Sequence, residues 1–447
     1  MSYESITNAC VKCGKCVPGC TIHEINADES TSPRGFLELI AAVRGGELNL
    51  DKNVKKIFES CFLCTNCVDA CPSSIRVDSA IEGVRFELAK RYKIAWYKRL
   101  AFALLGNRKI MDLVAKFGFV FQSCGFKIQG RDSFESVDKR GKIHKNLGMR
   151  ARFSMPMIKK GRFLLALSQK SFLNTQPSFI NNGGSRSVGL FVGCLSNYAY
   201  TATARAVLKI AAEVKVNVDL MKNQSCCGAP QYFTGDFDSV SRLAKKNIAY
   251  FEQKLATLDA IIVPEATCSA MLNVDYEHFF ELNGEGEWAR RAKKVAKRIF
   301  LATKYFYDET NLLEKLESKG KSELLVTYHD PCHARKMQGV FKEPRALLGA
   351  NFALVELARS ACCGFGGVSM QTEHFALASQ VGAKKAEDIK ASGANIVSAE
   401  CSACRMQISN ALENLENANF GENSQNLEKE NAQILFKNPL ELIASVL

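Results

Sequence analysis

The amino-acid sequence contains no long apolar run that would form a membrane span. Its charge-free stretches are broken by glycine, serine, asparagine and threonine, as in residues 187–204, whereas a transmembrane helix needs about 20 consecutive apolar residues. The opening residues, MSYESITNAC, are polar and lead directly into cysteine, so the basic start and apolar segment of a secretory signal are missing as well. We therefore expect a cytoplasmic protein without a transmembrane helix.

A nucleotide-binding or flavin-binding fingerprint is also missing. Gly320-Lys321-Ser322 lacks the upstream glycine of a phosphate loop, because Lys315 occupies that position. The glycines of CCGFGGVS, residues 362–369, follow a cysteine pair rather than a strand-to-helix phosphate turn. We therefore expect no flavin on this chain.

The excess of positive over negative charge lies in one segment. The 447 residues carry a net charge of +13, and residues 91–170 alone hold 19 Lys and Arg against 4 Asp and Glu. The rest of the chain is therefore slightly acidic, which argues against a general nucleic-acid-binding surface. With 47% hydrophobic and 23% charged residues the chain is an ordinary globular protein, and its length suggests about three domains.

Eighteen cysteines stand out against this ordinary composition. Eight lie within the first 71 residues, nine lie between Cys194 and Cys404, and Cys124 stands apart. In a chain without an export signal, clustered cysteines are more often metal ligands than disulfides. Cys124 lies among phenylalanines, which is typical of a thiol that packs in a core.

The first eight cysteines form two runs with identical spacing. Each run reads C-x2-C-x2-C-x3-C; the runs are Cys10, Cys13, Cys16 and Cys20, then Cys61, Cys64, Cys67 and Cys71. In two-cluster ferredoxins the first three cysteines of a run bind one [4Fe–4S] cluster and the fourth binds the other. The spacing therefore predicts two cubane clusters, one held by Cys10, Cys13, Cys16 and Cys71, the other by Cys61, Cys64, Cys67 and Cys20. A pair of structural zinc sites is the alternative, but zinc gives no reason for the third and fourth cysteine of each run.

The pattern of apolar residues predicts an α plus α/β architecture. Residues 1–90 read as a small helical domain around the cysteine runs, with helices over FLELIAAVR, 52–59 and 80–91. Residues 91–185 read as a basic helical connector. From residue 188 onward, short β-branched runs alternate with amphipathic helices, which indicates parallel α/β sheets. Cys226-Cys227-Gly228 aligns with Cys362-Cys363-Gly364, so we expect a duplicated domain, 186–320 and 321–447.

The second half of this repeat carries a further candidate metal site. Its five cysteines are Cys332, Cys362, Cys363, Cys401 and Cys404. They would converge at the carboxyl ends of parallel strands, with Gly364 allowing close approach of the backbone. The first half has Cys194, Cys226, Cys227 and Cys268, with Gly228 in the corresponding place, but Met271 stands where the fifth cysteine is expected. A four-cysteine site and a set of reduced core cysteines both remain open there.

These motifs together resemble a known family. ACVKCGKCVPGC, SPRG at 32–35 and TATARAVL after Cys194 are similar to the iron–sulfur subunit of glycolate oxidase. CSAC followed by RMQI is more similar to the iron–sulfur subunit of anaerobic glycerol-3-phosphate dehydrogenase and to the catalytic chain of heterodisulfide reductase. The resemblance spans nearly the whole chain except residues 91–170. It implies that the five-cysteine site holds a non-cubane [4Fe–4S] cluster, and the missing cysteine at Met271 leaves a second such cluster in doubt.

The resemblance also implies a function and partners. We expect an iron–sulfur electron-transfer subunit that receives electrons from a flavin-containing dehydrogenase subunit, for a 2-hydroxy acid such as glycolate or lactate, and passes them to quinone at the membrane. The alternatives are a thiol–disulfide reductase, the glycerol-3-phosphate enzyme, and a zinc-stabilised nucleic-acid-binding protein; the eight ferredoxin-spaced cysteines disfavour the last.

His329 and His333 flank Cys332 and either tune the cluster or are ordinary polar groups. The basic segment, with Trp96, suits peripheral contact with an anionic membrane, a partner-docking face being the alternative.

Overall fold

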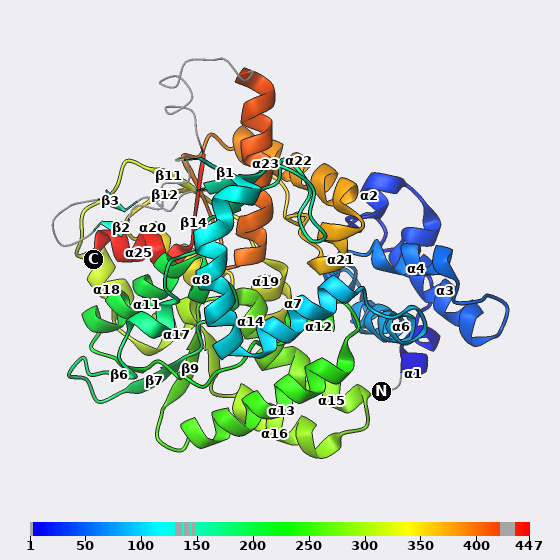
Figure 1. Ribbon diagram of the computed structural model, residues 1–447, viewed down its shortest axis with the longest axis horizontal. Coiled ribbons are helices and arrows are strands. Elements are labelled where there is room, and N and C mark those ends of the chain that lie inside the picture. Colours follow the sequence, from blue (N-terminus) through cyan, green and yellow to red (C-terminus); the bar gives the residue numbers. More distant parts are fainter. Residues whose placement is uncertain (1–2, 130–135, 138–142, 145–147, 421–433) are drawn as a thin grey trace.

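The computed structural model describes residues 3–129, 136–137, 143–144, 148–420 and 434–447 (Figure 1). The N-terminal helical region and the two α/β sheets confirm the predicted α plus α/β class. Among the described residues, no helix combines the length and the apolarity that crossing a membrane requires.

The N-terminal region consists of short helices around the cysteine runs. Ser32 accepts a hydrogen bond from the Gly35 amide and so caps the helix that Pro33 begins, while Asp51 caps the next long helix through the Asn53 and Val54 amides. The helix predicted over 52–59 is present with these bounds. The helices are α1 (Tyr3–Asn8), α2 (His23–Asn26), α3 (Pro33–Arg44), α4 (Lys52–Glu59), α5 (Asn66–Asp69) and α6 (Val77–Tyr92).

The connecting segment is helical only in its first half. Helices α7 (Trp96–Gly106) and α8 (Arg108–Gly125) are followed by an antiparallel sheet of β1 (Phe126–Gln129), β4 (Gly148–Ala151) and β5 (Phe163–Leu165). Strands β2 (Ser136–Val137) and β3 (Ile143–His144) form a separate pair, and α9 (Phe172–Thr175) follows. The prediction of an all-helical connector is therefore wrong beyond Gly125. These strands are too short to show a clear two-residue alternation in the sequence.

The first repeat contains a five-stranded sheet in the order β10-β9-β7-β8-β6. Strand β6 (Phe179–Ile180), which precedes the predicted bounds of the repeat, runs antiparallel to β8 (Asn217–Asp219) and makes the sheet mixed at this edge. The other strands, β7 (Ser187–Leu190), β9 (Ala260–Val263) and β10 (Ile299–Leu301), are parallel. The helices between them are α10 (Cys194–Tyr198), α11 (Thr201–Glu213), α12 (Ala229–Tyr232), α13 (Phe237–Lys254), α14 (Ala266–Ala270), α15 (Tyr276–Leu282) and α16 (Gly286–Ala296).

The second repeat has the same strand order as the first. Its four parallel strands run β12-β11-β13-β14, which matches β8-β7-β9-β10 strand for strand. The strands are β11 (Leu325–Tyr328), β12 (Ala353–Val355), β13 (Ile396–Ser398) and β14 (Leu435–Lys437). The helices are α19 (Cys332–Gln338), α20 (Lys342–Gly349), α21 (Gly367–Thr372), α22 (Phe375–Ala391) and α23 (Ser402–Phe420). The common topology agrees with the duplication that the cysteine pairs predicted, while the exact domain boundaries stay a prediction.

The two repeats exchange helices. After β10, helix α17 (Ala302–Glu309) packs against α20 of the second repeat, and α18 (Leu312–Glu317) follows it. After β14, helix α25 (Pro439–Val446) packs against α11 of the first repeat. Phe306, Val207 and Leu440 are all fully buried in one hydrophobic cluster that extends across both sheets. The repeats therefore share one core and are not separate globules.

Candidate metal centres

The two ferredoxin-type loops follow the same backbone course. Lys12 and Leu63, each two residues after the first cysteine of a run, have φ of 58° and 49°. Gly14 and Thr65, each directly after the second cysteine, have φ of 80° and 56°. Left-handed residues at alternate positions turn successive amide groups toward the inside of a loop, which creates a concavity for an anion. An iron–sulfur cluster with four thiolate ligands carries negative charge and fits such a concavity.

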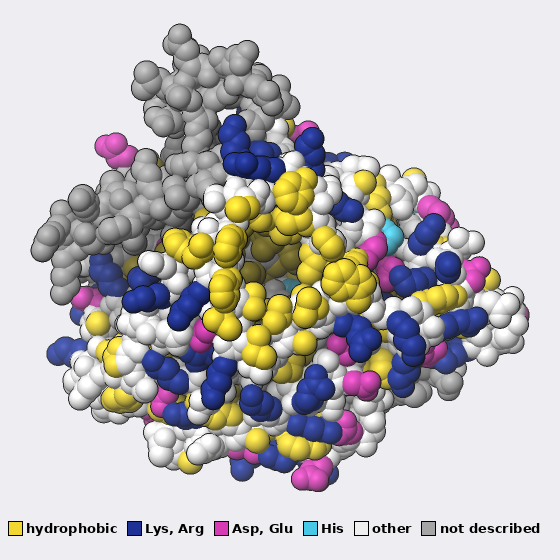
Figure 2. Space-filling model, viewed as in Figure 1, with side chains coloured by type: hydrophobic (Ala, Val, Ile, Leu, Met, Phe, Trp, Pro, Cys, Tyr) yellow, Lys and Arg dark blue, Asp and Glu magenta, His cyan; other side chains and the backbone are white. Residues whose placement is uncertain are grey.

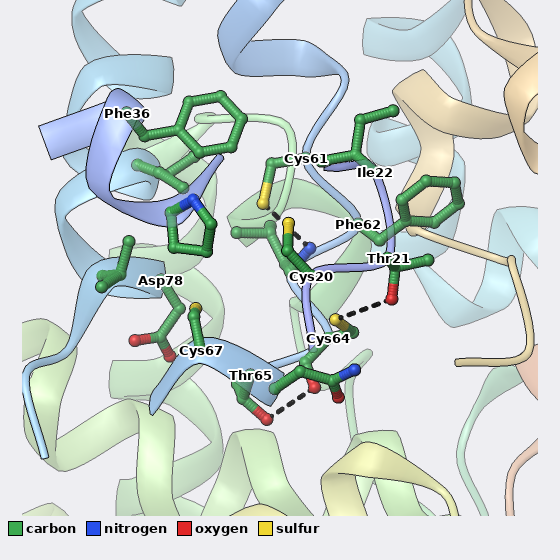
Figure 3. A pocket seen from close by; sticks show the side chains of 15 residues that line it. Cys20, Thr21, Ile22, Phe36, Cys61, Phe62, Cys64, Thr65, Cys67 and Asp78 are labelled. Atoms are coloured by element: carbon green, nitrogen blue, oxygen red, sulfur yellow. Dashed lines mark hydrogen bonds between the residues drawn. The ribbon is translucent and has the colours of Figure 1, made fainter. Parts of the chain in front are cut away.

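One predicted ligand set surrounds a cavity in the ferredoxin-type region. Figure 3 shows the sulfur atoms of Cys20, Cys61, Cys64 and Cys67 around this small cavity. The Leu63 amide lies 3.4 Å from Cys61 Sγ and points toward it, and the Thr21 hydroxyl lies 3.4 Å from Cys64 Sγ. The fourth cysteine of the first run thus meets three cysteines of the second run, as the spacing predicted.

The other predicted set lines the adjacent cavity. Cys10, Cys13, Cys16 and Cys71 are among its lining residues, together with Pro72. Cys67 lines both cavities, so the two sets are direct neighbours. The structure brings together the thiols that the two cubane clusters would need; their role as ligands stays a prediction.

Burial favours the neutral form of the thiols around the first cavity, those of Cys20, Cys61, Cys64 and Cys67. It raises the pKa of Cys20 to about 11 and that of Cys61 to about 12. Buried Arg85, close to Cys61, acts in the opposite direction. Because iron is bound by thiolates, a metal ion would have to supply the charge that deprotonates these sulfurs.

The five cysteines of the second repeat meet at the carboxyl ends of its strands. Cys332 begins α19 after β11, Cys362 and Cys363 follow β12, and Cys401 and Cys404 follow β13. Contacts with Cys362 and Cys404 lower the pKa of Cys363 to about 6, and contact with Cys404 lowers that of Cys401 to about 6. Several thiols thus lie within hydrogen-bonding reach of one another in a buried space, as a cluster site requires.

Gly364 directly follows the cysteine pair and has a conformation that suits glycine. Its φ is 86°, and a Cβ built on it would lie 2.9 Å from the Ala378 carbonyl oxygen and 2.9 Å from the Gly382 amide nitrogen. Gly364 therefore allows the cysteine loop to lie directly on α22. Gly228 in the first repeat also has positive φ, of 90°, but without comparable crowding.

The two flanking histidines occupy different environments. A ring nitrogen of His329 lies within 4.8 Å of Cys363 Sγ and Cys404 Sγ, and burial lowers its pKa to about 3. His333 lies 3.5 Å from Cys332 Sγ and packs against the ring of Phe233. His329 is thus a neutral group inside the five-cysteine site, and His333 lies at its edge.

The four cysteines of the first repeat also converge. Cys194 and Cys226 lie within hydrogen-bonding reach, which raises the pKa of Cys194 and lowers that of Cys226. Contact with Cys226, and then with Cys268, raises the pKa of Cys227. Met271 is fully buried in the hydrophobic cluster that contains Cys227, and it begins a π-helical turn, Met271–Asp275, between α14 and α15. The structure therefore offers four thiols here, with an apolar side chain in place of a fifth.

The thiol groups of different regions touch one another. Cys64 of the ferredoxin-type region is within hydrogen-bonding reach of Cys362 in the second repeat. Lys336 on α19 donates a hydrogen bond to Asn66 on α5 and so joins the two regions beside these thiols. Thr267 of the first repeat lies 3.3 Å from Cys401 Sγ. The four groups of cysteines are thus neighbours in one series, in which Thr267 rather than a thiol makes the last link.

Several residues that stabilise this arrangement carry no recognisable signal in the sequence. Glu265 is buried and accepts hydrogen bonds from Ser196 in its own repeat and from the Ser402 amide and hydroxyl in the other repeat. Buried Lys385 contributes positive charge near Cys362 and Cys363. Thr21 stands where a proline often follows the fourth cysteine, and its hydroxyl approaches Cys64. Their neighbours come from distant segments, so only the fold reveals them.

Comparison with known proteins agrees with this architecture. Residues 6–75 match a 4Fe-4S dicluster domain, and residues 188–273 and 326–409 each match a cysteine-rich CCG domain. Together these matches cover more than half of the chain. The chain therefore belongs to the family of iron–sulfur proteins that join a 4Fe-4S dicluster domain to CCG domains, and it is an iron–sulfur component of the oxidoreductase class.

Named relatives include three kinds of protein. A probable glycolate oxidase iron–sulfur subunit of Bacillus subtilis is 28% identical over 377 residues, 80% of this chain and 79% of the relative. A fumarate reductase (CoM/CoB) subunit of Methanothermobacter marburgensis is 27% identical over 415 residues, 90% of this chain and 68% of the relative. Lactate utilization protein A of Exiguobacterium is 31% identical over 229 residues, 51% of this chain and 90% of the relative.

Proposed function

We propose that this chain is the iron–sulfur electron-transfer subunit of a flavin-dependent dehydrogenase for a 2-hydroxy acid such as glycolate or lactate. The observation that carries the proposal is the succession of neighbouring cysteine groups, from Cys10 through Cys64 and Cys362 to Cys401 and, through Thr267, to the first repeat. The names of the glycolate oxidase and lactate utilization relatives support the substrate class. No fingerprint for a flavin occurs in the sequence, so oxidation of the substrate is assigned to a flavin-bearing partner subunit.

The proposed cofactors are two cubane clusters and one non-cubane [4Fe–4S] cluster. Their proposed ligands are the two crossed sets of ferredoxin cysteines and the five cysteines of the second repeat. A fourth cluster would be held by the cysteines of the first repeat, Cys194, Cys226, Cys227 and Cys268. The relatedness of the repeats favours this cluster, and Met271 in place of a fifth cysteine disfavours it. Such clusters, when bound, take up and release single electrons.

The residues of the chain would hold the sites in a fixed order. The set containing Cys10 adjoins the set containing Cys64 through Cys67, and Cys64 in turn reaches Cys362. The proposed entry for electrons is the exposed ferredoxin-type set, where Cys13 is the exposed cysteine. The proposed exit is toward quinone at the cytoplasmic face of a membrane, beyond the CCG repeats.

Positive side chains lie beside the sites and would offset the negative charge of bound clusters. Arg85 lies near Cys61, Lys336 lies near both Cys64 and Cys332, and Lys385 lies near Cys362. Buried positive charge close to a cluster stabilises its reduced form and so raises its reduction potential. The chain would thereby favour the passage of electrons inward from the exposed set.

The test is the substitution Cys363→Ser in the complex isolated anaerobically with its partner subunit. We expect both cubane signals in electron paramagnetic resonance to persist and quinone reduction to stop. Cys124→Ser is the matched control and should leave both properties unchanged. Cys124 is exposed on α8, so the core position suggested by its phenylalanine neighbours in the sequence is wrong. Unchanged quinone reduction in Cys363→Ser would refute the role of the second repeat. Adding glycolate, lactate or glycerol 3-phosphate to the wild-type complex would identify the substrate by cluster reduction.

A thiol–disulfide reductase is the second candidate function. It is favoured by the relative named as a subunit of fumarate reductase (CoM/CoB) and by an open cavity beside Cys362. Glu24 and Asp388 line this cavity and pair with Arg359 and Lys384, and Lys385 adds a further positive charge. The lining thus keeps a small excess of positive charge, which would favour a negatively charged disulfide. Turnover of a heterodisulfide with a reduced dye would support this candidate, particularly if none of the three hydroxy substrates reduces the clusters.

A further inference from the structure

Helices α7 and α8 expose an apolar face to solvent. Eight of the twelve large apolar side chains that are exposed in the described part of the chain lie on these two helices. Those with 54% to 71% of their surface exposed are Trp96, Leu100, Leu113, Phe117, Val120 and Phe121. Figure 2 shows apolar side chains gathered over α7 and α8, around a hollow in this face of the molecule. We call this the α7–α8 face.

The inner sides of the same helices bury apolar Phe102 and Ala115, and polar contacts hold them in place beside these residues. Lys98 is 3% exposed, and its Nζ donates to Ser369 Oγ at 3.0 Å and to Glu373 Oε2 at 2.7 Å. On α8, Asp112 accepts a hydrogen bond from the Tyr198 hydroxyl at 2.9 Å. Helices on the surface of a globular protein normally bury their apolar side and expose their charges. Here one lysine is buried while six large apolar side chains are more than half exposed, so most of the large apolar surface of these helices has no partner in the described part of the chain.

Basic side chains border the α7–α8 face. Between residues 91 and 127 there are eight Lys or Arg and a single acidic residue, Asp112, which is turned inward. The exposed members include Lys93, Arg99, Lys109, Lys116 and Lys127. Figure 2 shows Lys and Arg around the border of the apolar area. An apolar surface with a positively charged border favours a partner that has an apolar interior beneath a negatively charged surface.

The composition of this border distinguishes a membrane from a protein partner. Lysine is depleted in protein–protein interfaces, where charged side chains would lose their water. Helices that lie on membranes instead combine Phe, Leu and Trp on the inserted side with Lys and Arg beside the lipid headgroups. Lysine can stay hydrated there while it attracts anionic lipid.

We propose that the α7–α8 face inserts its apolar side chains into the surface of an anionic lipid bilayer, and that Lys109, Lys116 and Lys127 contact the lipid headgroups. This inference specifies the membrane contact of the proposed function and so rests on it. Lipid binding is measured without turnover, so a failure of docking and a failure of electron transfer give different results.

The geometry also places a thiol site behind this face. A small cavity is lined by Leu105, Arg108 and Met111 of the two helices and by Cys194 and Cys226 of the first repeat. The α7–α8 hairpin is held against the repeats by Lys98 on one side and by Tyr198 on the other. A bilayer that contacts the outer side of the hairpin would therefore lie close to the first repeat.

The test uses the full chain, purified with its clusters, and lipid vesicles. Vesicles of phosphatidylcholine alone are compared with vesicles of phosphatidylcholine and phosphatidylglycerol. We expect co-sedimentation with the anionic vesicles only. The triple variant Leu113→Ser, Phe117→Ser, Phe121→Ser should bind at least about tenfold more weakly. The matched control Phe179→Ser, Leu324→Ser changes two exposed apolar residues outside this face and should bind like the wild type.

Two further measurements keep the test decisive. Replacing Lys109, Lys116 and Lys127 by glutamine should weaken binding roughly fivefold for each lysine, and added salt should have a similar effect. In a Trp288→Phe background, the fluorescence of Trp96 should shift to shorter wavelength on addition of anionic vesicles. The proposal is overturned if the wild type ignores anionic vesicles or if the serine variant binds as well as the wild type. It is equally overturned if the wild type self-associates through the α7–α8 face, or binds its partner subunit there, in preference to vesicles.

Discussion

Replacing Arg85 would test how strongly the ferredoxin-type region depends on a single side chain. Arg85 on α6 is 4% exposed. Its guanidinium donates five hydrogen bonds to four carbonyl oxygens, two of them to Phe58 at 3.1 and 2.9 Å. The others reach Glu59 at 3.3 Å, Cys61 at 2.7 Å and Phe233 at 2.9 Å. One side chain thus fixes the loop that carries Cys61 and joins it to the first repeat.

The expected cost follows from the groups left without partners. A buried carbonyl that loses its donor costs about 1–3 kcal/mol, and Arg85→Met would deprive up to four carbonyls. The substitution also removes the cost of burying a guanidinium, which offsets part of this loss. We expect a net destabilisation of about 3–5 kcal/mol, a large fraction of the roughly 5–15 kcal/mol that stabilises a typical domain. Arg85→Lys keeps the charge but not the planar fork of donors, so its stability should lie between those of the wild type and Arg85→Met.

The measurement is anaerobic denaturant unfolding, followed by protein fluorescence and by the visible absorbance of the clusters. In Arg85→Met we expect earlier unfolding and loss of the cluster bound by Cys61 before that bound by Cys10. Arg44→Met is the matched control, because Arg44 forms a half-exposed ion pair with Glu87 in the same region and such pairs contribute about 0–1 kcal/mol. The reasoning is refuted if Arg85→Met and Arg44→Met unfold at the same denaturant concentration.

Two further predictions concern a glycine and a buried acid. Gly364→Ala should lower the iron content of the second repeat and destabilise the chain by more than Gly46→Ala. Gly46 has a similar φ of 77° but nothing within 4 Å of the added Cβ, so its substitution measures the conformational cost of about 1–2 kcal/mol alone. Equal effects of the two substitutions on iron content and unfolding would contradict the crowding at Gly364. Burial raises the pKa of Asp275 to about 6, so the folded chain holds this proton more tightly than the unfolded chain and loses stability as the pH rises through about 6. Between about pH 5 and about pH 7, denaturant unfolding should show a loss of stability that is smaller in Asp275→Asn than in the wild type by about 1 kcal/mol; equal pH dependence would exclude Asp275 as a source.

The sequence predicts the parts of the sites that depend on local spacing. A three-cysteine loop has few ways to surround a cluster, so the grouping of Cys20 with Cys61, Cys64 and Cys67 follows from the spacing alone. The helix over 52–59 could likewise be predicted from the sequence, because Asp51 caps it and its apolar residues recur with helical periodicity. The repeat of the CCG domains was visible because both copies keep a cysteine pair followed by glycine.

The relations between regions could not be predicted in this way. The contact between Cys64 and Cys362 depends on how α5 meets α19, through side chains such as Asn66 and Lys336 that are common on any surface. The short strands of the connector, β1, β4 and β5, are held by pairing across 126–165 rather than by their own sequence pattern. The exposure of the apolar side chains on α7 and α8 likewise depends on which side of each helix meets the repeats.

The exchange of helices between the repeats affects the order in which the protein can be completed. Helix α25 covers α11, yet it is synthesised about 225 residues later. Buried Arg405 on α23 donates a hydrogen bond to Glu441 on α25, and Glu441 also accepts a hydrogen bond from Thr203 on α11. Glu441 therefore joins three segments that are distant in the sequence. On the ribosome, the first repeat would remain with an uncovered apolar helix until the second repeat has emerged. We therefore expect insertion of iron to follow release of the chain, and shortened chains lacking α25 to be removed by proteolysis before they acquire a full set of clusters.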